Sequence, residues 1–228
     1  MLQITEIKDR SEQGVSKPFI CTASDGQWYF VKGMNTDRQS LINEWLCAHL
    51  AREFGLPIPT FHLLYLTGEH YEHVKPAHKE IGMGYMFGSQ RRDGVDWLEK
   101  HHVSRIGASL KKDILVFDRW VQNTDRTDGN PNLIFDTLSS ELSVIDHNLA
   151  FDGQFNDKSF LQHHVFRDNW GQIVGDWVEK NEYNEKIKSA SLMLDAAWQT
   201  IPEEWFWLNE ERDVPANTLS KDHITNIT

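Results

Sequence analysis

The chain has 228 residues, of which 39% are hydrophobic and 25% are charged, and its formal net charge is −11. These values are typical of a soluble globular protein that can form one large core or two small lobes. Non-specific binding to nucleic acid or to an anionic membrane is disfavoured, because both need clustered positive charge. The first ten residues are too polar for a signal peptide, and no apolar run approaches the ~20 residues of a membrane span. We therefore expect a cytoplasmic protein.

The first half of the chain has the pattern of several strands and one strong helix. Asp25-Gly26 separates two apolar, β-prone runs, which is a strong hairpin signal. The helical segment carries its apolar residues on one stripe, Gly55 ends it, and Pro57 prevents its continuation. The predicted elements are strands at 17–24, 27–32, 61–66 and 84–87 and a helix at 39–54.

The second half has a mainly helical pattern with one hairpin in it. The apolar spacing predicts a broken helical segment over 94–122, one helix marked by apolar residues between 165 and 178, another between 187 and 198, and a short one from 201. The predicted hairpin consists of Leu133–Phe135 and Leu142–Ile145. The tail after about Asp213 is polar, and we expect it to be frayed.

The cysteines and histidines show no disulfide or zinc pattern. Cys21 falls in a predicted strand and Cys47 in the predicted helix, so they could pair only through an accident of the fold. We expect both to be buried free thiols. The eleven histidines lack the spacing of a helix-borne zinc pair with a third ligand, and we interpret them as surface or packing residues.

The segment 118–151, DRWVQNTDRTDGNPNLIFDTLSSELSVIDHNLAF, carries the main functional signal. Asp125 precedes Asn130 by five positions, a short hairpin follows, and Asp146 ends an apolar strand. A phosphoryl-transfer enzyme needs a carboxylate that orients the attacking hydroxyl and oxygen ligands for magnesium. Protein-kinase catalytic loops have the same Asp-to-Asn step, followed by a metal-binding Asp. The segment therefore predicts Asp125 as the catalytic base and Asn130 and Asp146 as metal ligands.

Two other features of this segment leave alternatives open. Asn132 directly precedes the strand Leu-Ile-Phe, where the metal-binding Asn of protein kinases usually lies, so it is the reserve for Asn130. An Asn/Gly/Pro cluster could also be no more than a turn. Arg126 could neutralise nearby charge or pair with Asp118, which would be costly to bury unpaired.

The first half of the chain holds the candidate nucleotide-binding residues. Lys32 ends the strand Tyr-Phe-Val-Lys and could reach inward to phosphates, although strand-end lysines commonly lie in solvent. Glu44 could hold Lys32 by an ion pair, with Asn43 as the neighbouring alternative, or it could simply complement the helix N-terminus. The loop with Gly14 and Ser16 could offer backbone N–H groups to phosphates, or only connect two strands.

Several short motifs between about residues 10 and 208 occur together in this chain. They are the loop QGVSKP, the strand YFVK, the helix NEWLCAHLAREFGLPIP, the segment MFGS, the run NTDRTDGNPNLIF, the strand VIDHNLAF and the closing IPEEW. In combination they resemble the HipA-like kinase family, in particular its short single-chain members. The stretch NTDR…NLI…IDHNLAF is also similar to type II phosphatidylinositol 4-kinases.

The resemblance implies an α+β fold of the two-lobed, protein-kinase-like type. Residues 1–88 would form a nucleotide-binding lobe with an antiparallel sheet and one helix. Residues 89–228 would form a mainly helical catalytic lobe that contains the catalytic-loop hairpin. The two lobes together would make one kinase domain.

The resemblance also implies ATP and Mg²⁺ as cofactors and assigns roles to residues. Lys32 would be the nucleotide lysine, and the loop around Gly14 would cover the phosphates. Phe87, in the segment Met86-Phe87-Gly88, would contact the adenine. Ser11 or Ser16 could be autophosphorylated, as a loop serine is in some HipA-like toxins.

The residues and the resemblance together predict an ATP- and Mg²⁺-dependent HipA-like Ser/Thr protein kinase that phosphorylates a protein hydroxyl. One alternative is a lipid or small-molecule kinase, although the chain lacks the clustered cysteines that anchor type II lipid kinases. Another is a nucleotide-binding, non-catalytic component of a toxin–antitoxin system, with an antitoxin-like partner. The intact set of Asp125, Asn130 and Asp146 argues against this last alternative, because a pseudokinase has usually lost one of them.

Overall fold

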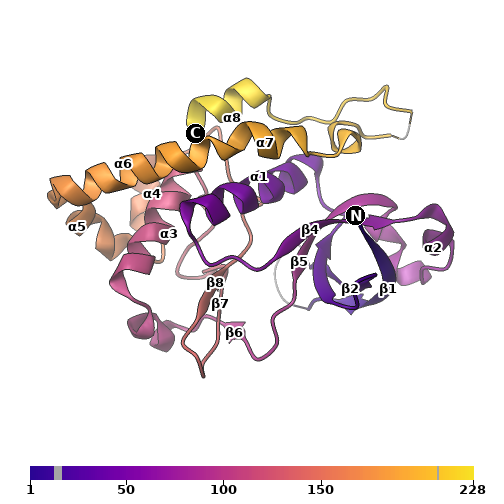
Figure 1. Cartoon of the computed structure of the whole chain (residues 1–228), viewed down its shortest axis with the longest axis horizontal. Coiled ribbons are helices and arrows are strands. Elements are labelled where there is room, and N and C mark those ends of the chain that lie inside the picture. Colours follow the sequence, from indigo (N-terminus) through magenta and orange to yellow (C-terminus); the bar gives the residue numbers. More distant parts are fainter. Residues whose placement is uncertain (13–16, 210) are drawn as a thin grey trace. The chain divides into compact units, whose positions relative to one another are not determined.

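The computed structural model describes residues 1–12, 17–209 and 211–228. Contacts between residues divide the chain into two compact units. Unit 1 consists of Met1–Ile42, Pro59–Asp93 and Ile201–Thr218, and unit 2 of Asn43–Ile58, Gly94–Thr200 and Leu219–Thr228. Figure 1 shows the elements of both units along the chain. The lobe boundary that we place at residue 88 on the sequence stays a prediction.

Unit 1 contains a closed barrel of five strands in the order β1-β2-β3-β5-β4 (Figure 1). The strands are β1 (Leu2–Arg10), β2 (Phe19–Ala23), β3 (Trp28–Lys32), β4 (Phe61–Leu66) and β5 (Gly84–Gln90). Neighbouring strands are antiparallel except for β1 and β4, which pair in parallel through Leu2 with Leu64 and Gln3 with Tyr65. The predicted antiparallel sheet is therefore corrected to a barrel closed by a parallel pair. The strand β1 was not predicted, because its hydrophobic residues Leu2, Ile4 and Ile7 do not alternate strictly and only Ile4 is buried.

The predicted hairpin at Asp25-Gly26 joins β2 to β3. Gly26 adopts a φ of +77°, which glycine reaches without steric cost, and its N–H donates to the Ala23 carbonyl at 2.9 Å. Alternate residues of β2 point into the barrel, so Cys21 is fully buried. Burial raises the pKa of this thiol to about 12. Both Cys21 and Cys47 are buried and free, as expected from the sequence.

The segment 201–218 returns to the barrel and completes the hydrogen bonding of β5. The last register pair between β3 and β5 joins Lys32 to Phe87, so β3 does not reach Tyr85 of β5. There the N–H of Tyr85 donates to the Glu204 carboxylate, and the Trp205 indole N–H donates to the Tyr85 carbonyl at 3.0 Å. Trp205 is fully buried in the 3₁₀ helix Glu203–Phe206. The segment is therefore an integral part of unit 1.

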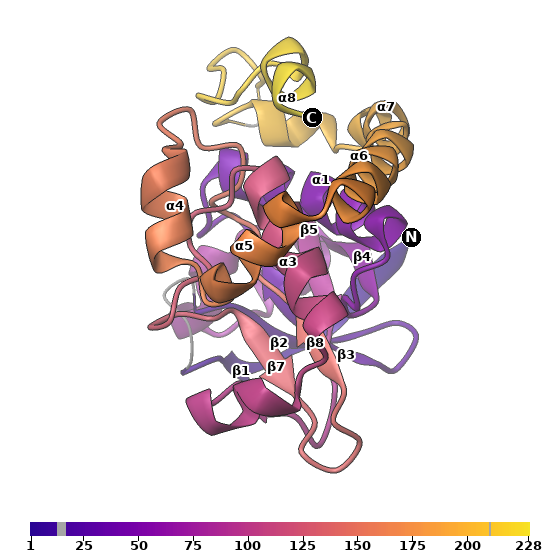
Figure 2. The same ribbon diagram turned by 90° about the vertical axis from the view of Figure 1, so that its left-hand side faces the viewer.

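Unit 2 combines helices with a small sheet of three strands. The sheet has the order β6-β7-β8, and its β7–β8 hairpin lies within one residue of the predicted bounds. Figure 2 shows α3, α5 and α6 packed together. No helix among the described residues is both long and apolar enough to cross a membrane. The strands are β6 (Asp96–Trp97), β7 (Leu133–Phe135) and β8 (Leu142–Val144), and the helices are α3 (Ala108–Trp120), α4 (Asp157–His163), α5 (Trp170–Gly175), α6 (Trp177–Ser191), α7 (Met193–Gln199) and α8 (Lys221–Ile227).

The remaining helices are α1, α2 and short 3₁₀ turns. The helix α1 (Arg38–Phe54) matches the predicted helix, and the boundary between the units falls inside it, after Ile42. In unit 2, the Phe54 ring at its end lies 5.5 Å from Phe117 of α3 and 6.5 Å from Tyr183 of α6, between ring centroids. These aromatic contacts fix α1 against α3 and α6. The other elements are α2 (Gly68–Glu72) and the 3₁₀ helices Pro76–Ile81, Lys100–Arg105 and Arg167–Asn169.

Two helix predictions in this half, and the expectation for the tail, are corrected by the structure. The helix expected between 165 and 178 is divided, because the Asp176 side chain accepts the N–H groups of Val178 and Glu179 and starts α6 there. Several apolar residues whose spacing suggested a buried helix face are exposed, and Trp177 is 77% exposed. The helix expected between 187 and 198 is likewise divided into α6 and α7. The tail is not wholly frayed, since Ile224 of α8 is fully buried.

The Trp205 contact yields a stability prediction. We expect Trp205→Phe to lower the free energy of unfolding by about 1–2 kcal/mol, because the partly buried Tyr85 carbonyl loses its donor while most of the ring remains. Urea denaturation followed by circular dichroism measures this change. Trp28→Phe is the matched control, because Trp28 is 42% exposed and should change stability by less than about 0.5 kcal/mol. Equal effects of the two substitutions would contradict the role of the indole N–H.

Candidate active site

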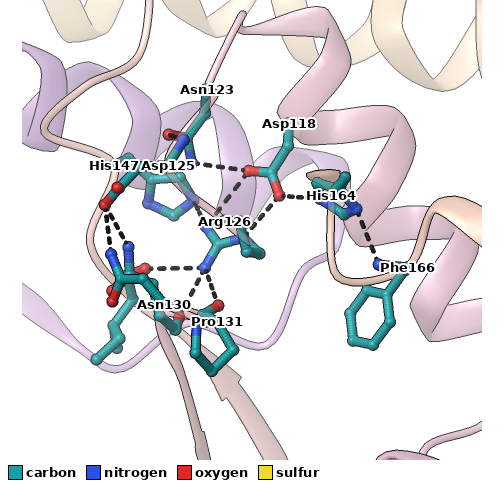
Figure 3. A network of polar contacts seen from close by, with 11 residues as sticks. Asp118, Asn123, Asp125, Arg126, Asn130, Pro131, His147, His164 and Phe166 are labelled. Atoms are coloured by element: carbon teal, nitrogen blue, oxygen red, sulfur yellow. Dashed lines mark hydrogen bonds and ion pairs between the residues drawn. The ribbon is translucent and has the colours of Figure 1, made fainter. Parts of the chain in front are cut away.

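The loop between α3 and β7 brings three of the predicted site residues together. Nδ2 of Asn130 donates to Oδ2 of Asp125 at 2.8 Å (Figure 3), and Nδ2 of Asn132 donates to the same oxygen, also at 2.8 Å. A carboxylate can only accept, so each amide turns its nitrogen toward Asp125 and leaves its oxygen for another partner. The structure therefore brings together both asparagines between which the sequence left a choice. An amide oxygen is a suitable ligand for a hard cation such as Mg²⁺.

The fourth predicted residue, Asp146, follows the strand β8 and is linked to the same loop by backbone contacts. The N–H of Ile145 donates to the Asn132 carbonyl at 3.1 Å, which places the residue before Asp146 beside Asn132. Asn132 and Asp146 have positive φ angles of 47° and 59°. Asn and Asp tolerate this left-handed region best among non-glycine residues, and such backbone commonly marks functional sites. A common cation between Asp146 and Asn130 stays a prediction.

Arg126 holds these two stretches of backbone together from a fully buried position. Its Nη1 donates to the carbonyls of Asn132 at 2.6 Å, Ile145 at 3.1 Å and Pro131 at 3.2 Å. Its Nε donates to Oδ2 of Asp118 at 2.6 Å. The guanidinium therefore joins the start of β7, the residue before Asp146 and the helix α3, and Figure 3 shows its bonds to Asp118 and Pro131.

Asp118 is the anionic counterpart of Arg126, as the sequence suggested. Both side chains are fully buried. Oδ1 of Asp118 also accepts from Asn123 at 3.0 Å, and Oδ2 accepts from His164 at 3.0 Å. Burial raises the pKa of Asp118, but the Arg126 charge and the hydrogen bonds outweigh it, so this pKa lies well below its usual range. The Asp118 carboxylate is therefore ionised at neutral pH.

His164 is held in one neutral tautomer by its two partners. The backbone N–H of Phe166 donates to Nδ1 at 3.1 Å, so Nδ1 carries no proton. The proton on Nε2 is the one donated to Asp118. Burial lowers the pKa of His164, and the bond to Asp118 offsets only part of this effect. His147 has the opposite arrangement, because its Nε2 can only accept from Nη2 of Arg126, at 3.2 Å.

The segment 164–167 docks against the loop between α3 and β7. The N–H of Val165 donates to the Arg126 carbonyl at 3.1 Å, and the Arg167 guanidinium pairs with Asp128 at 2.7 Å. His164 and Asn123 were not predicted as members of the site. No local pattern could identify His164, since it meets Asp118 across a large separation in sequence.

The remaining predicted residues lie apart along the chain. Lys32 is 7% exposed at the end of β3, where it pairs in register with Phe87 of β5, which is 6% exposed. Glu44 of α1 is 3% exposed, and its Oε2 accepts the N–H of His147 at 3.2 Å. Lys32 belongs to unit 1 and Glu44 to unit 2, and their ion pair stays a prediction. The predicted residues Gly14 and Ser16 lie outside the described residues.

Comparison with known proteins identifies the family. A model of the HipA-like kinases matches residues 4–227. The chain belongs to the HipA-like kinase family. This membership confirms the resemblance seen in the sequence and makes the chain a kinase by family. Among curated proteins, none matches the sequence.

A solved structure shows how the fold of this HipA-like kinase compares with another kinase. The crystal structure of the Helicobacter pylori proinflammatory kinase CtkA is similar, with a TM-score of 0.50 and 12% sequence identity. The similarity covers 99% of this chain and 90% of that one. At this identity the likeness concerns the fold alone. It confirms a mixed α/β, kinase-like fold.

The buried pair of Arg126 and Asp118 yields a second stability prediction. We expect Arg126→Met to lower the free energy of unfolding by about 3–5 kcal/mol, because Asp118 would keep a buried charge without its counterpart. Chemical denaturation measures the loss. Arg119→Met is the matched control, since Arg119 pairs with Asp157 at the surface, where ion pairs contribute at most about 1 kcal/mol. A loss for Arg126→Met no greater than that of the control would contradict the proposed importance of the pair.

His164 yields a prediction for the pH dependence of stability. Unfolded His164 binds a proton near its usual pKa of about 6.5, whereas the folded residue, with its lowered pKa, does not. The unfolded state therefore binds more protons below that pH, and stability falls as the pH drops from 7 to 5. We expect His164→Gln to flatten this slope in denaturation curves measured across that range. The exposed neighbour His163 is the control, and a His163→Gln variant that flattened the slope equally would refute the assignment.

Proposed function

We propose that this chain is an ATP- and Mg²⁺-dependent Ser/Thr protein kinase that transfers the γ-phosphoryl group of ATP to a protein hydroxyl. The observation that carries the proposal is the group of Asp125, Asn130 and Asn132, in which one carboxylate oxygen binds both amides. Membership of the HipA-like kinase family supports the same reaction class. The proposal includes a cytoplasmic location and a protein as the phosphate acceptor.

Asp125 acts on the acceptor hydroxyl. Its Oδ2 is occupied by the two amides, whereas Oδ1 has no hydrogen-bond partner within the described part of the chain. We assign Oδ1 to the acceptor hydroxyl, whose oxygen attacks the γ-phosphorus in line with the leaving oxygen of ADP. The bond from that phosphorus to the β–γ bridging oxygen breaks as the new P–O bond forms. The hydroxyl proton passes to Asp125 late in the reaction.

The cation would be held by side-chain oxygens of Asn130, Asn132 and Asp146. The donor set fits Mg²⁺, because all are hard oxygen ligands and the amide oxygens are turned away from Asp125. A bound Mg²⁺ would neutralise negative charge on the phosphates during transfer. Arg126 holds the backbone of Asn132 and of Ile145, the residue before Asp146. The proposed ligands Asn132 and Asp146 would therefore be positioned before any cation binds.

The nucleotide would be bound by residues of unit 1. Lys32 has the low exposure of a residue that points away from bulk solvent, and we assign its ammonium group to the phosphates. Its register partner Phe87 is assigned to the adenine ring. Glu44 would orient Lys32, and the loop with Gly14 and Ser16 would cover the phosphates.

A kinase assay on variants tests the proposal. We expect Asp125→Asn to lower the rate of phosphoryl transfer from radiolabelled ATP by about 100-fold or more, because the general base is lost. Asp146→Asn should have a comparable effect through loss of a metal ligand. Asp128→Asn is the matched control in the same loop, because Asp128 pairs with Arg167 at the surface, and it should retain activity.

The distribution of the label decides between acceptor classes. Label on a protein that disappears with Asp125→Asn supports the proposal. Label found only in a lipid or small-molecule fraction would refute the protein acceptor. Full activity of Asp125→Asn would refute the assignment of the catalytic base.

A further inference from the structure

The short segment that follows Asp146 is held by side chains of α1. This segment, 147–150, has no regular secondary structure. The N–H of His147 donates to Oε2 of Glu44 at 3.2 Å. The carbonyls of Asn148 and Ala150 both accept from Nδ2 of Asn43, at 2.9 Å and 2.8 Å. All of these residues belong to unit 2. Two consecutive helix residues therefore satisfy three backbone groups of the segment.

An asparagine side chain is unfavourable at position 43 unless it has hydrogen-bond partners. It is 3% exposed in the interior of α1, where asparagine is a poor helix former and a buried amide without partners is costly. Its two N–H groups offset that cost, because both donate to backbone carbonyls of the segment. Neither a carboxylate nor an aliphatic side chain could replace them, since neither donates.

The hydrogen bonds of Asn43 constrain a stretch of backbone that begins directly after Asp146. The segment lies between two left-handed residues, Asp146 at φ +59° and Phe151 at φ +58°. The N–H of Phe151 donates to the Val121 carbonyl at 2.7 Å, and the N–H of Ala150 donates to the His147 carbonyl at 3.0 Å. Asn43 ties Asn148 and Ala150 of this turn to α1. Without it, the backbone from Asp146 to Phe151 would lose two of its fixed points.

We propose that Asn43 is a positioning residue that sets the direction of the Asp146 carboxylate and thereby the affinity of the site for its divalent cation. The inference rests on the proposed function, because it takes Asp146 as a metal ligand. Asn43 acts through the backbone carbonyls of Asn148 and Ala150 and touches neither cation nor substrate. Its loss should weaken metal binding rather than the chemical step at saturating metal. Substitutions of residues that orient metal ligands typically cost about 10–100-fold in metal affinity.

The test measures metal binding directly and does not depend on turnover. Mn²⁺ is titrated into the full chain with a non-hydrolysable ATP analogue, and free Mn²⁺ is quantified by electron paramagnetic resonance. We expect Asn43→Ala to raise the Kd for Mn²⁺ by about 10-fold. In kinase assays the Mg²⁺ concentration for half-maximal rate should rise similarly, and the rate at saturating Mg²⁺ should recover most of the wild-type value.

Trp45→Phe is the matched control on the same helix. The Trp45 indole N–H donates to Thr200 at 2.9 Å and so lies in a different set of contacts. This variant should lose some thermal stability and keep the wild-type Kd for Mn²⁺. If Asn43→Ala does not fold, Asn43→Ser is used instead, because its hydroxyl offers one donor in place of two, and it should weaken Mn²⁺ binding in the same direction.

The outcomes separate this inference from the proposed function. If Asp146→Asn loses Mn²⁺ binding while the Asn43 variants bind like the wild type, the positioning role is refuted and the proposed function stands. If Asp146→Asn binds Mn²⁺ like the wild type, the assignment of the metal ligand is wrong and the inference fails with it. A Kd raised equally in Trp45→Phe would show a general effect of helix stability and would also refute the role of Asn43.

Discussion

The arrangement of the loop between α3 and β7 depends on one buried guanidinium. Each of the three nitrogens of the Arg126 side chain donates a hydrogen bond, to a carboxylate, a histidine or backbone carbonyls. A buried cation without such partners would cost several kcal/mol, so the fold can contain Arg126 only when the chain segments that supply its acceptors are all in place. These segments are α3, the start of β7 and the residue before Asp146. Correct assembly of the loop and burial of this charge are therefore the same event.

This constraint explains how loop residues outside helices and strands can keep a fixed geometry. Asp146 has no regular strand or helix around it, yet the residues on both sides are held, Ile145 by Arg126 and His147 by Glu44. The contacts are made to backbone atoms, which every residue has, so they fix the path of the chain without using the carboxylate of Asp146. Such pre-organisation lowers the entropic cost of assembling a site when a substrate or cation binds.

The sequence revealed the parts of the molecule that depend on local or short-range patterns. Asp25-Gly26 specified a hairpin, and the order of Asp125, Asn130 and Asp146 indicated the candidate site together with its family. Contacts between distant segments left no such pattern, which is why the parallel closure of the barrel and the bond from His164 to Asp118 were missed. The choice between Asn130 and Asn132 was also beyond spacing arguments, because the structure gives both amides the same partner.

The burial of α1 shows why two of its residues carry information that periodicity could not provide. Every residue from 41 to 47 is at most 7% exposed, and this stretch covers nearly two turns, at about 3.6 residues per turn. The side chains of Asn43 and Glu44 therefore cannot reach solvent, and they must form hydrogen bonds with polar groups of the protein. Those groups include the backbone of the segment after Asp146. A rotation of α1 would have to break these bonds, so the position of the Asp146 carboxylate is set by the helix as well as by the loop that carries it.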